Sequence, residues 1–144
     1  ATSGSTQVQL AKQIWKSLGS YINELSPAAH DAAFAAVSHL PHVLSYAIIR
    51  GIFQQHNGPD LIALGGPGFR DFSRIAASDP IVWRDILSTN REQVLLQIHH
   101  FKAALNDFEK AIQANDPQAL EEMIRQASDL RFNWRMGANQ TSEE

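Results

Sequence analysis

The sequence of 144 residues contains no cysteine and has no excess of positive charge. Without cysteine there can be no disulfide framework and no thiolate nucleophile, which fits a reducing compartment, so we expect a cytoplasmic protein. Twelve lysine and arginine residues against 15 acidic residues give a net charge of −3. Because such a chain has no basic field to attract nucleic acid or an anionic membrane, we expect neither as a partner.

Several motifs with known chemistry are also absent. No GxGxxG follows a predicted strand, so the chain cannot by itself supply a Rossmann dinucleotide site. There is no nucleophile elbow, Walker loop or HExxH motif. The opening ATSGSTQVQL lacks the basic and apolar regions of a secretory signal, and polar side chains interrupt the most apolar stretch, residues 32–53. We therefore expect no leader and no membrane anchor, and a buried helix rather than a membrane span.

Apolar side chains at helical spacing dominate the chain, whose 144 residues and 44% hydrophobic content suit one domain. The first half predicts a helix over 7–18, a short strand from Tyr21 to Leu25, and a helix that begins at Ser26-Pro27 and kinks at Pro41. Beyond the kink, residues 43–53 are apolar on almost every side. Such a helix needs protein all round it, at the centre of a bundle or at a subunit interface.

Cap and breaker signals divide the second half of the chain. Asn57-Gly58-Pro59 ends the kinked helix, and residues 60–68 are expected to form a loop with at most a short helical turn. Three more helices are predicted: one from Asp79-Pro80 to about Leu87, a long one after the capping box 89–92, and a last one from Asp116-Pro117. Because the connector 114–116 is short, the last two should form an antiparallel hairpin. The polar tail, residues 137–144, is expected to be disordered.

His39 and His42 form the first candidate site. They lie three residues apart, so a helical backbone up to Pro41 would present both imidazoles to one pocket. Three interpretations remain open: a metal site, two structural histidines bonded to backbone carbonyls, and a contact with an anionic or polar ligand. A metal site would need a third ligand in a recognisable pattern, which the chain does not offer, and we expect no metal.

The stretch from Gly65 to Trp83 is the second candidate site, because it places three glycines and two arginines in one passage from loop to helix. Apolar neighbours such as Phe72 are expected to bury Arg74 at least in part, and a buried guanidinium must find an anion. That anion is either Asp71 or Asp79 of this chain, or the carboxylate of a ligand. The simpler interpretation is a surface loop in which Arg70 and Asp71 form a solvated pair.

These motifs together resemble the C-terminal, helical half of prephenate/arogenate dehydrogenases. The resemblance covers roughly residues 7–134 and rests on Ser26-Pro27 with His30-Asp31, VSHLPH at 37–42, GFRDFSRIAASDP at 68–80, Trp83-Arg84-Asp85-Ile86, and Asn90. It implies an all-α domain, a kinked long helix with a helical hairpin, that dimerises by interlocking with a second copy. Residues 1–25 would then be the last helix and strand of a preceding Rossmann domain, and residues 26–136 the dimerisation and substrate-binding domain.

The resemblance also implies roles for individual residues. Arg74 would bind a substrate carboxylate through its guanidinium fork, and His42 with His39 would line the same pocket. Arg70 and Asp71 would form a gate that extends toward the partner subunit, and Trp83 would pack under the arginine; Gly68 completes the set of substrate-binding residues. No catalytic residue is expected in this chain. One departure from the family pattern is Pro67, where a further glycine is more usual.

For function, the resemblance implies oxidative decarboxylation of prephenate or arogenate in tyrosine biosynthesis, with tyrosine as a candidate inhibitor. NAD or NADP would be bound by a preceding N-terminal domain, so the isolated chain is expected to be inactive. An alternative from a different class is a stand-alone helical dimer that binds an aromatic amino acid or keto acid as a regulatory module. A purely structural helical adaptor would bind no ligand at all.

Overall fold

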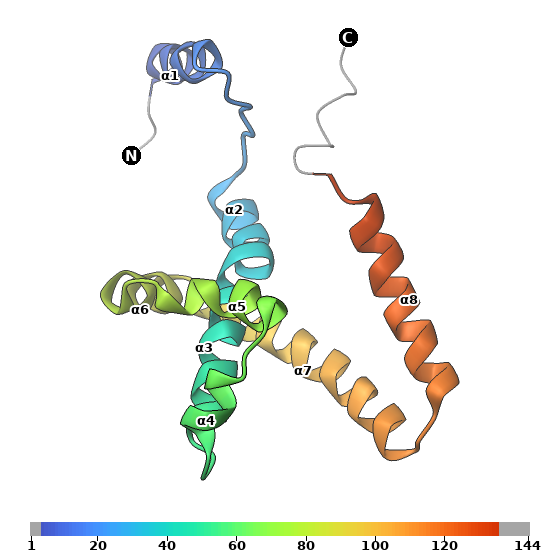
Figure 1. Ribbon diagram of the computed structural model, residues 1–144. Helices are drawn as coiled ribbons and strands as arrows, with labels where there is room; N and C mark the ends of the chain where they lie inside the picture. The colour runs from blue at the N-terminus through green and yellow to red at the C-terminus, as the bar shows by residue number, and fades with distance from the viewer. Residues whose placement is uncertain (1–3, 136–144) are drawn as a thin grey trace. The chain divides into compact units, whose positions relative to one another are not determined.

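The computed structural model describes residues 4–135, which are helical with short connections and contain no strand (Figure 1). The elements in chain order are α1 (Ser5–Ser17), α2 (Pro27–Phe34), the π-helix η1 (Ala35–His39), α3 (Leu40–Phe53), α4 (Gly58–Ala63), α5 (Pro67–Ser73), the 3₁₀-helix η2 (Arg74–Ala77), α6 (Pro80–Thr89), α7 (Arg91–Gln113) and α8 (Pro117–Asn133). The all-α class predicted from the sequence is confirmed.

The predicted strand from Tyr21 to Leu25 is wrong. These residues run as irregular chain between α1 and α2. A strand needs a neighbouring strand to take up its backbone hydrogen bonds, and the described part of the chain offers none. The expected tail at 137–144 lies outside the described residues.

Two compact units make up the chain. The larger spans residues 26–107, and the other combines residues up to 25 with those from 108 onward. Within the larger unit, α3 packs against α4, α5 and η2, so it is the central element there. The Ser45 hydroxyl, fully buried on α3, donates to the carbonyl oxygen of Phe72 at 3.3 Å and ties α3 to α5.

Three helices begin at the predicted cap-and-proline pairs. Ser26 accepts a hydrogen bond from the amide of Ala29 at 3.2 Å, and Asp116 accepts from the amides of Gln118 and Ala119. Asp79 caps α6 in the same way, and the residue after each cap is proline. The missing N–H of that proline costs nothing because the first amides of a helix have no partner within it.

The kink predicted at Pro41 takes the form of a π-helical stretch. Residues 27–53 are helical throughout, but the five residues of η1 before Leu40 have the wider π geometry. A proline ring clashes with the carbonyl four residues earlier and cannot donate to it, and a wider turn relieves both problems. Ala35, in η1, is fully buried. By length and composition alone, this continuous helix could also cross a membrane, a property it shares with core helices of soluble domains.

The loop predicted over residues 60–68 is mostly helix, since α4 and α5 occupy most of it. Gly58 begins α4 so close to the end of α3 that an added Cβ would lie 2.5 Å from the carbonyl oxygen of Ile52. Pro67 is the first residue of α5, with Gly66 as N-cap at φ −84°. The family departure at Pro67 therefore places proline where its fixed φ and missing N–H suit a helix start.

The last two helices are connected as a hairpin, through the short connector 114–116, in which Asn115 takes a left-handed φ of 51°. The long helix is confirmed and begins at Arg91, within the predicted capping box, but Thr89 of that box is the last residue of α6 and does not cap the long helix. That α7 and α8 lie antiparallel against each other stays a prediction.

Large apolar side chains are unusually exposed in this chain. Leu105 on α7 is 53% exposed, and Ile124 and Leu130 on α8 are 58% and 77% exposed. Buried apolar residues are few by comparison, with Ala35, Val94 and Ala111 the core of the described chain. So many exposed apolar side chains favour association with another protein.

Candidate functional site

Trp83 on α6 is the centre of an aromatic cluster with the two predicted histidines. Its ring stacks on His42 at 3.5 Å between centroids with 22° between planes, and His39 meets it edge-on at 6.1 Å. Tyr46, one helical turn after His42 on α3, contacts both the His42 and Trp83 rings. The structure therefore brings His39 and His42 to one place, as their spacing predicted, and α6 supplies the surface on which they rest.

Hydrogen bonding fixes the tautomer of His42. Its Nδ1 lies 2.9 Å from the carbonyl oxygen of Ser38, and a carbonyl can only accept, so Nδ1 carries a proton and donates. The neutral ring then has a lone pair on Nε2. This bond to a backbone carbonyl is the one expected of a structural histidine, yet it also orients the other nitrogen for a ligand.

His39 is held differently, by the side chain of Asn90 at the junction of α6 and α7. Asn90 Nδ2 lies 3.2 Å from His39 Nδ1 and 2.8 Å from the carbonyl oxygen of Asp31. The pKa of His39 is lowered from its ordinary value, first by burial and then by the nearby His30 and His42, while Asp31 acts in the opposite direction. Near neutral pH this ring is therefore held in its uncharged form.

A hollow of about 490 Å³ opens beside Trp83 and is lined by residues that include Tyr46, Ser78 and Leu87. The Tyr46 hydroxyl is buried and has no hydrogen-bond partner among residues 4–135. Nothing in our sequence analysis singled out Tyr46. Its position four residues after His42 was the available signal, because residues four apart share a helix face.

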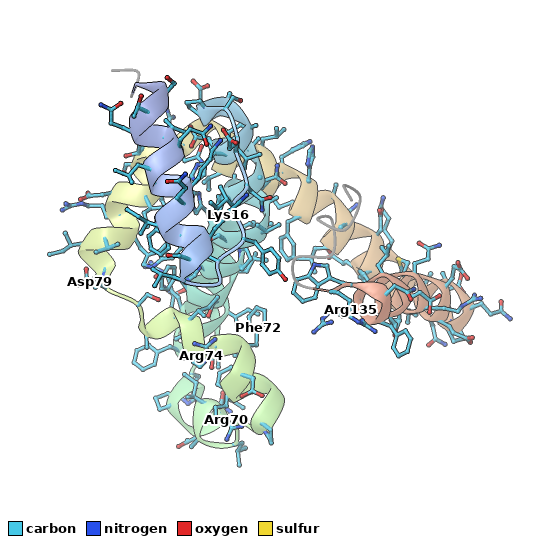
Figure 2. All side chains as sticks on the ribbon, turned by 90° about the horizontal axis from the view of Figure 1, so that it is seen from above. Lys16, Arg70, Phe72, Arg74, Asp79 and Arg135 are labelled. Atoms are coloured by element: carbon cyan, nitrogen blue, oxygen red, sulfur yellow. The ribbon has the colours of Figure 1, made fainter. Side chains whose placement is uncertain are left out.

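Arg74, the predicted carboxylate ligand, begins η2 and is exposed rather than buried. Neither of the two internal anions proposed for it is its partner. Asp71 accepts from Arg70 Nε at 3.2 Å, and Asp79 accepts from the amides of Ile81 and Val82. Figure 2 shows Arg74 and Asp79 lying apart. Within the described range of the chain, the Arg74 guanidinium has no ion pair or hydrogen bond and remains available to an external anion.

The expected burial of Arg74 is wrong, although Phe69, Ile75 and Ala76 of the same segment are half-buried. Phe72 is 45% exposed, and Arg70 and Asp71 form the solvated pair of the simpler interpretation, with side chains 76% and 70% exposed. Helix α3 packs against α5 and η2, but it leaves the Arg74 side chain exposed. Trp83 packs on His42, and no cation–π contact joins it to Arg74 in residues 4–135, so its expected place under the arginine is not observed. Gly68, the second residue of α5, is exposed with open space around its Cα.

A metal centre finds no support in the geometry. In residues 4–135, no three histidine or acidic side chains are placed to share an ion. Both site histidines use Nδ1 for bonds to protein groups, and both rings contact Trp83. The aromatic cluster instead offers two oriented imidazoles and an indole face, while Arg74, which makes no described contact with that cluster, offers a free guanidinium. These are groups that suit a planar organic anion.

Comparison with known proteins identifies the family. A sequence model described as "Prephenate dehydrogenase, dimerization domain" matches residues 26–126. The chain belongs to this family. The match takes in α2 through most of α8, and with them His39, His42, Arg74 and Trp83.

Individual members of the prephenate dehydrogenase family are similar over most of the chain. The cyclohexadienyl dehydrogenase of Zymomonas mobilis is 33% identical over 120 residues, 82% of this chain and 41% of that protein. The prephenate dehydrogenase of Bacillus subtilis is 29% identical over 86% of this chain and 34% of its own length. A crystal structure of prephenate dehydrogenase from Aquifex aeolicus, in complex with hydroxyphenyl propionate and NAD+, superposes with a TM-score of 0.83 at 34% identity. The superposed region covers 90% of this chain and 46% of the Aquifex aeolicus chain.

The chain thus spans less than half the length of the dehydrogenases it matches. A Rossmann-type site needs a strand whose carboxyl end opens on a phosphate-binding loop, and residues 4–135 contain no strand. The described residues therefore do not fit a nicotinamide dinucleotide on their own.

Proposed function

We propose that this chain is the substrate-binding and dimerisation part of a prephenate or arogenate dehydrogenase of tyrosine biosynthesis, acting in the cytoplasm. The reaction is the NAD- or NADP-dependent oxidative decarboxylation of prephenate or arogenate, with the dinucleotide held by the part of the relatives that this chain does not span. The stand-alone regulatory module is not favoured, because the relatives are named as dehydrogenases.

The observation that carries the proposal is the free guanidinium of Arg74. Both acidic residues near it in the sequence are engaged elsewhere, Asp71 with Arg70 and Asp79 with the start of α6. A guanidinium binds a carboxylate through two parallel hydrogen bonds, and the substrates named by the family are carboxylates. We assign Arg74 to a substrate carboxylate, with Gly68, Arg70 and Asp71 on the same exposed segment closing over the site when substrate is bound.

The two imidazoles and Trp83 complete the substrate pocket of this proposal. The hollow beside Trp83 gives room for a six-membered ring, with His42 stacked on one face of the indole and His39 against it edge-on as sources of hydrogen-bonding nitrogens. The ligand named for the Aquifex aeolicus structure, hydroxyphenyl propionate, combines a ring, a carboxylate and a hydroxyl, which matches this set of groups. Tyrosine has the same ring, carboxylate and hydroxyl, so we propose it as a competing inhibitor.

Dimer formation is the second part of the proposal. An apolar groove of about 510 Å³ runs between α3, α5 and α7, lined by Leu44, Ala47, Ile48, Phe72, Phe101 and Leu105. We propose that a second copy of the chain fills it, in keeping with the dimerization domain that the family model describes. Leu105→Glu should then give a monomer by size-exclusion chromatography with light scattering, whereas Ala103→Glu, on α7 outside the groove lining, should stay dimeric. A dimer with Leu105→Glu would contradict this assignment.

The substrate assignment is tested by Arg74→Ala in the protein that carries the nicotinamide-binding domain. Removing the guanidinium that binds a carboxylate of the substrate, in a covered site, should cost about 2–4 kcal/mol of binding free energy. This corresponds to roughly a 30- to 900-fold rise in KM for prephenate. Arg125→Ala, another exposed arginine, serves as the control and should leave KM unchanged. Thermal unfolding should be nearly equal in all three proteins, because Arg74 makes no contact that folding depends on. An unchanged KM in folded Arg74→Ala would refute the assignment.

A further inference from the structure

Asn90 lies where three parts of the larger unit meet. Its Nδ2 is 2.8 Å from the carbonyl oxygen of Asp31 on α2 and 3.2 Å from Nδ1 of His39 in η1, and Asn90 itself joins α6 to α7. These contacts span 59 and 51 residues of sequence. The side chain therefore sets how the histidine sits relative to the helix that carries Trp83.

The chemistry of the two partners decides which groups face each other. A backbone carbonyl accepts and never donates, so the atom of Asn90 that faces Asp31 must be the amide nitrogen, which has two hydrogens. The second hydrogen is available for His39 Nδ1, and an amide nitrogen offers no lone pair in return. His39 Nδ1 must then be the unprotonated nitrogen, and the ring proton lies on Nε2.

We propose that Asn90 is a positioning residue that locks His39 in the Nε2-protonated tautomer, so that His39 donates a hydrogen bond to a substrate oxygen from Nε2. This inference rests on the proposed function for the identity of the substrate, although the tautomer itself does not. His42 has the opposite tautomer, since its Nδ1 donates to Ser38. The two imidazoles on Trp83 thus present one donor and one acceptor.

The opposite polarity of the two rings suits a substrate that carries both kinds of group. A carboxylate or keto oxygen accepts from His39 Nε2, and a hydroxyl donates to the Nε2 lone pair of His42. If His39 were protonated, its Nδ1–H would point at the amide hydrogens of Asn90, an unfavourable donor–donor contact. The charged and titratable groups near His39 are His30 and Asp31 on α2 and His42 on α3; His30 and Asp31 also contact each other at 3.1 Å.

The first test observes the tautomer directly. In the chain labelled with ¹⁵N-histidine, two-bond proton–nitrogen correlation spectra distinguish the two neutral tautomers, and the His39→Gln variant assigns the His39 signals. The wild type should show His39 protonated on Nε2 near neutral pH. Asn90→Asp places an acceptor where the donor stood, so it should move the proton to Nδ1 and shift the His39 titration to higher pH. Asn57→Asp, which adds the same charge at a position without a side-chain cap bond, should change neither signal.

The second test asks whether the tautomer matters for substrate. In the protein with its nicotinamide-binding domain, Asn90→Asp should shift the acid limb of the kcat/KM profile for prephenate to higher pH, and Asn57→Asp should not. A wild-type His39 protonated on Nδ1 would overturn the proposal, whether or not the enzyme is active and whether or not any variant folds. A switched tautomer with an unchanged pH profile in an active enzyme would overturn the link to substrate alone, while absence of dehydrogenase activity would count against the proposed function and leave the tautomer result standing.

Discussion

Replacing Asp79 with alanine should lower the free energy of unfolding by about 1–2 kcal/mol. The Asp79 carboxylate accepts hydrogen bonds from the amides of Ile81 at 2.8 Å and Val82 at 3.0 Å. Pro80, between Asp79 and Ile81, has no N–H that needs a partner. Loss of an N-cap costs about 0.5–2 kcal/mol, and the upper part of that range applies because one ionised oxygen serves two amides. Trp83 is the fourth residue of α6, so fraying of this turn should also loosen its stack on His42.

Urea unfolding measures this loss when all variants are compared at one protein concentration, since the stability of an associating protein depends on concentration. Asp79→Asn keeps a capping oxygen and should lose no more than about 0.5 kcal/mol. If Asp79→Asn is as unstable as Asp79→Ala, the carboxylate acts through its charge rather than as a cap, and the reasoning fails.

A double-mutant cycle with Arg74→Ala makes the test sharper. Because Asp79 bonds to the start of α6 and Arg74 has no partner in the described residues, the two substitutions should add within about 0.5 kcal/mol. A coupling free energy well above this value would return Asp79 to the role of internal anion for Arg74. It would also remove the observation on which the substrate assignment depends.

Three further predictions concern the larger unit. Gly58→Ala should lower the free energy of unfolding by more than about 1 kcal/mol, because its Cβ would lie 2.5 Å from a backbone carbonyl oxygen. Gly51→Ala, where a Cβ would meet open space in α3, should raise it by up to about 1 kcal/mol in the same urea assay. Tyr46→Phe removes a buried hydroxyl without a described partner and should leave the thermal midpoint unchanged or higher; a clear drop would show that the hydroxyl is bonded in solution. His39 has a lowered pKa, so the unfolded chain binds its proton more readily, and the stability that it contributes is full above pH 6.5 and lost as pH falls through the lowered folded-state pKa. The free energy of unfolding, measured from pH 8 to 5, should therefore fall less steeply for His39→Gln than for the wild type. Equal slopes for the two proteins would contradict the lowered pKa of His39.

The features that the sequence predicted well depend on contacts within a few residues. A serine or aspartate before a proline identified the starts of α2, α6 and α8, because cap bonds reach only two or three residues along the chain. The spacing of His39 and His42 likewise predicted that they would share one face, since only one turn separates them. The resemblance to the family identified the same residues and added Trp83, whose distance in sequence no local pattern could bridge.

The features that could not be predicted depend on distant partners. Asn90 was noticed only as part of a motif, and its bonds to Asp31 and His39 follow from how α2 and α7 meet. The strand expected at 21–25 has no neighbouring strand in the described chain to take up its backbone hydrogen bonds, so these residues alone could not form it. The π geometry of η1 follows from Pro41, yet a kink and a π-turn satisfy the same constraint and the sequence does not distinguish them.

The exposure of Arg74 links the two halves of the proposed function. An ion pair in water contributes about 0–1 kcal/mol, because the solvent competes for both charges and screens them. The loss of about 2–4 kcal/mol expected for Arg74→Ala requires that the bound carboxylate be covered and dry. In the larger unit α3 packs on one side of this segment but leaves Arg74 exposed, and the apolar groove beside Phe72 is open as well. We therefore expect the chain alone to bind substrate weakly, and the full effect of Arg74 to emerge only when a second copy and the nicotinamide-binding domain enclose the site.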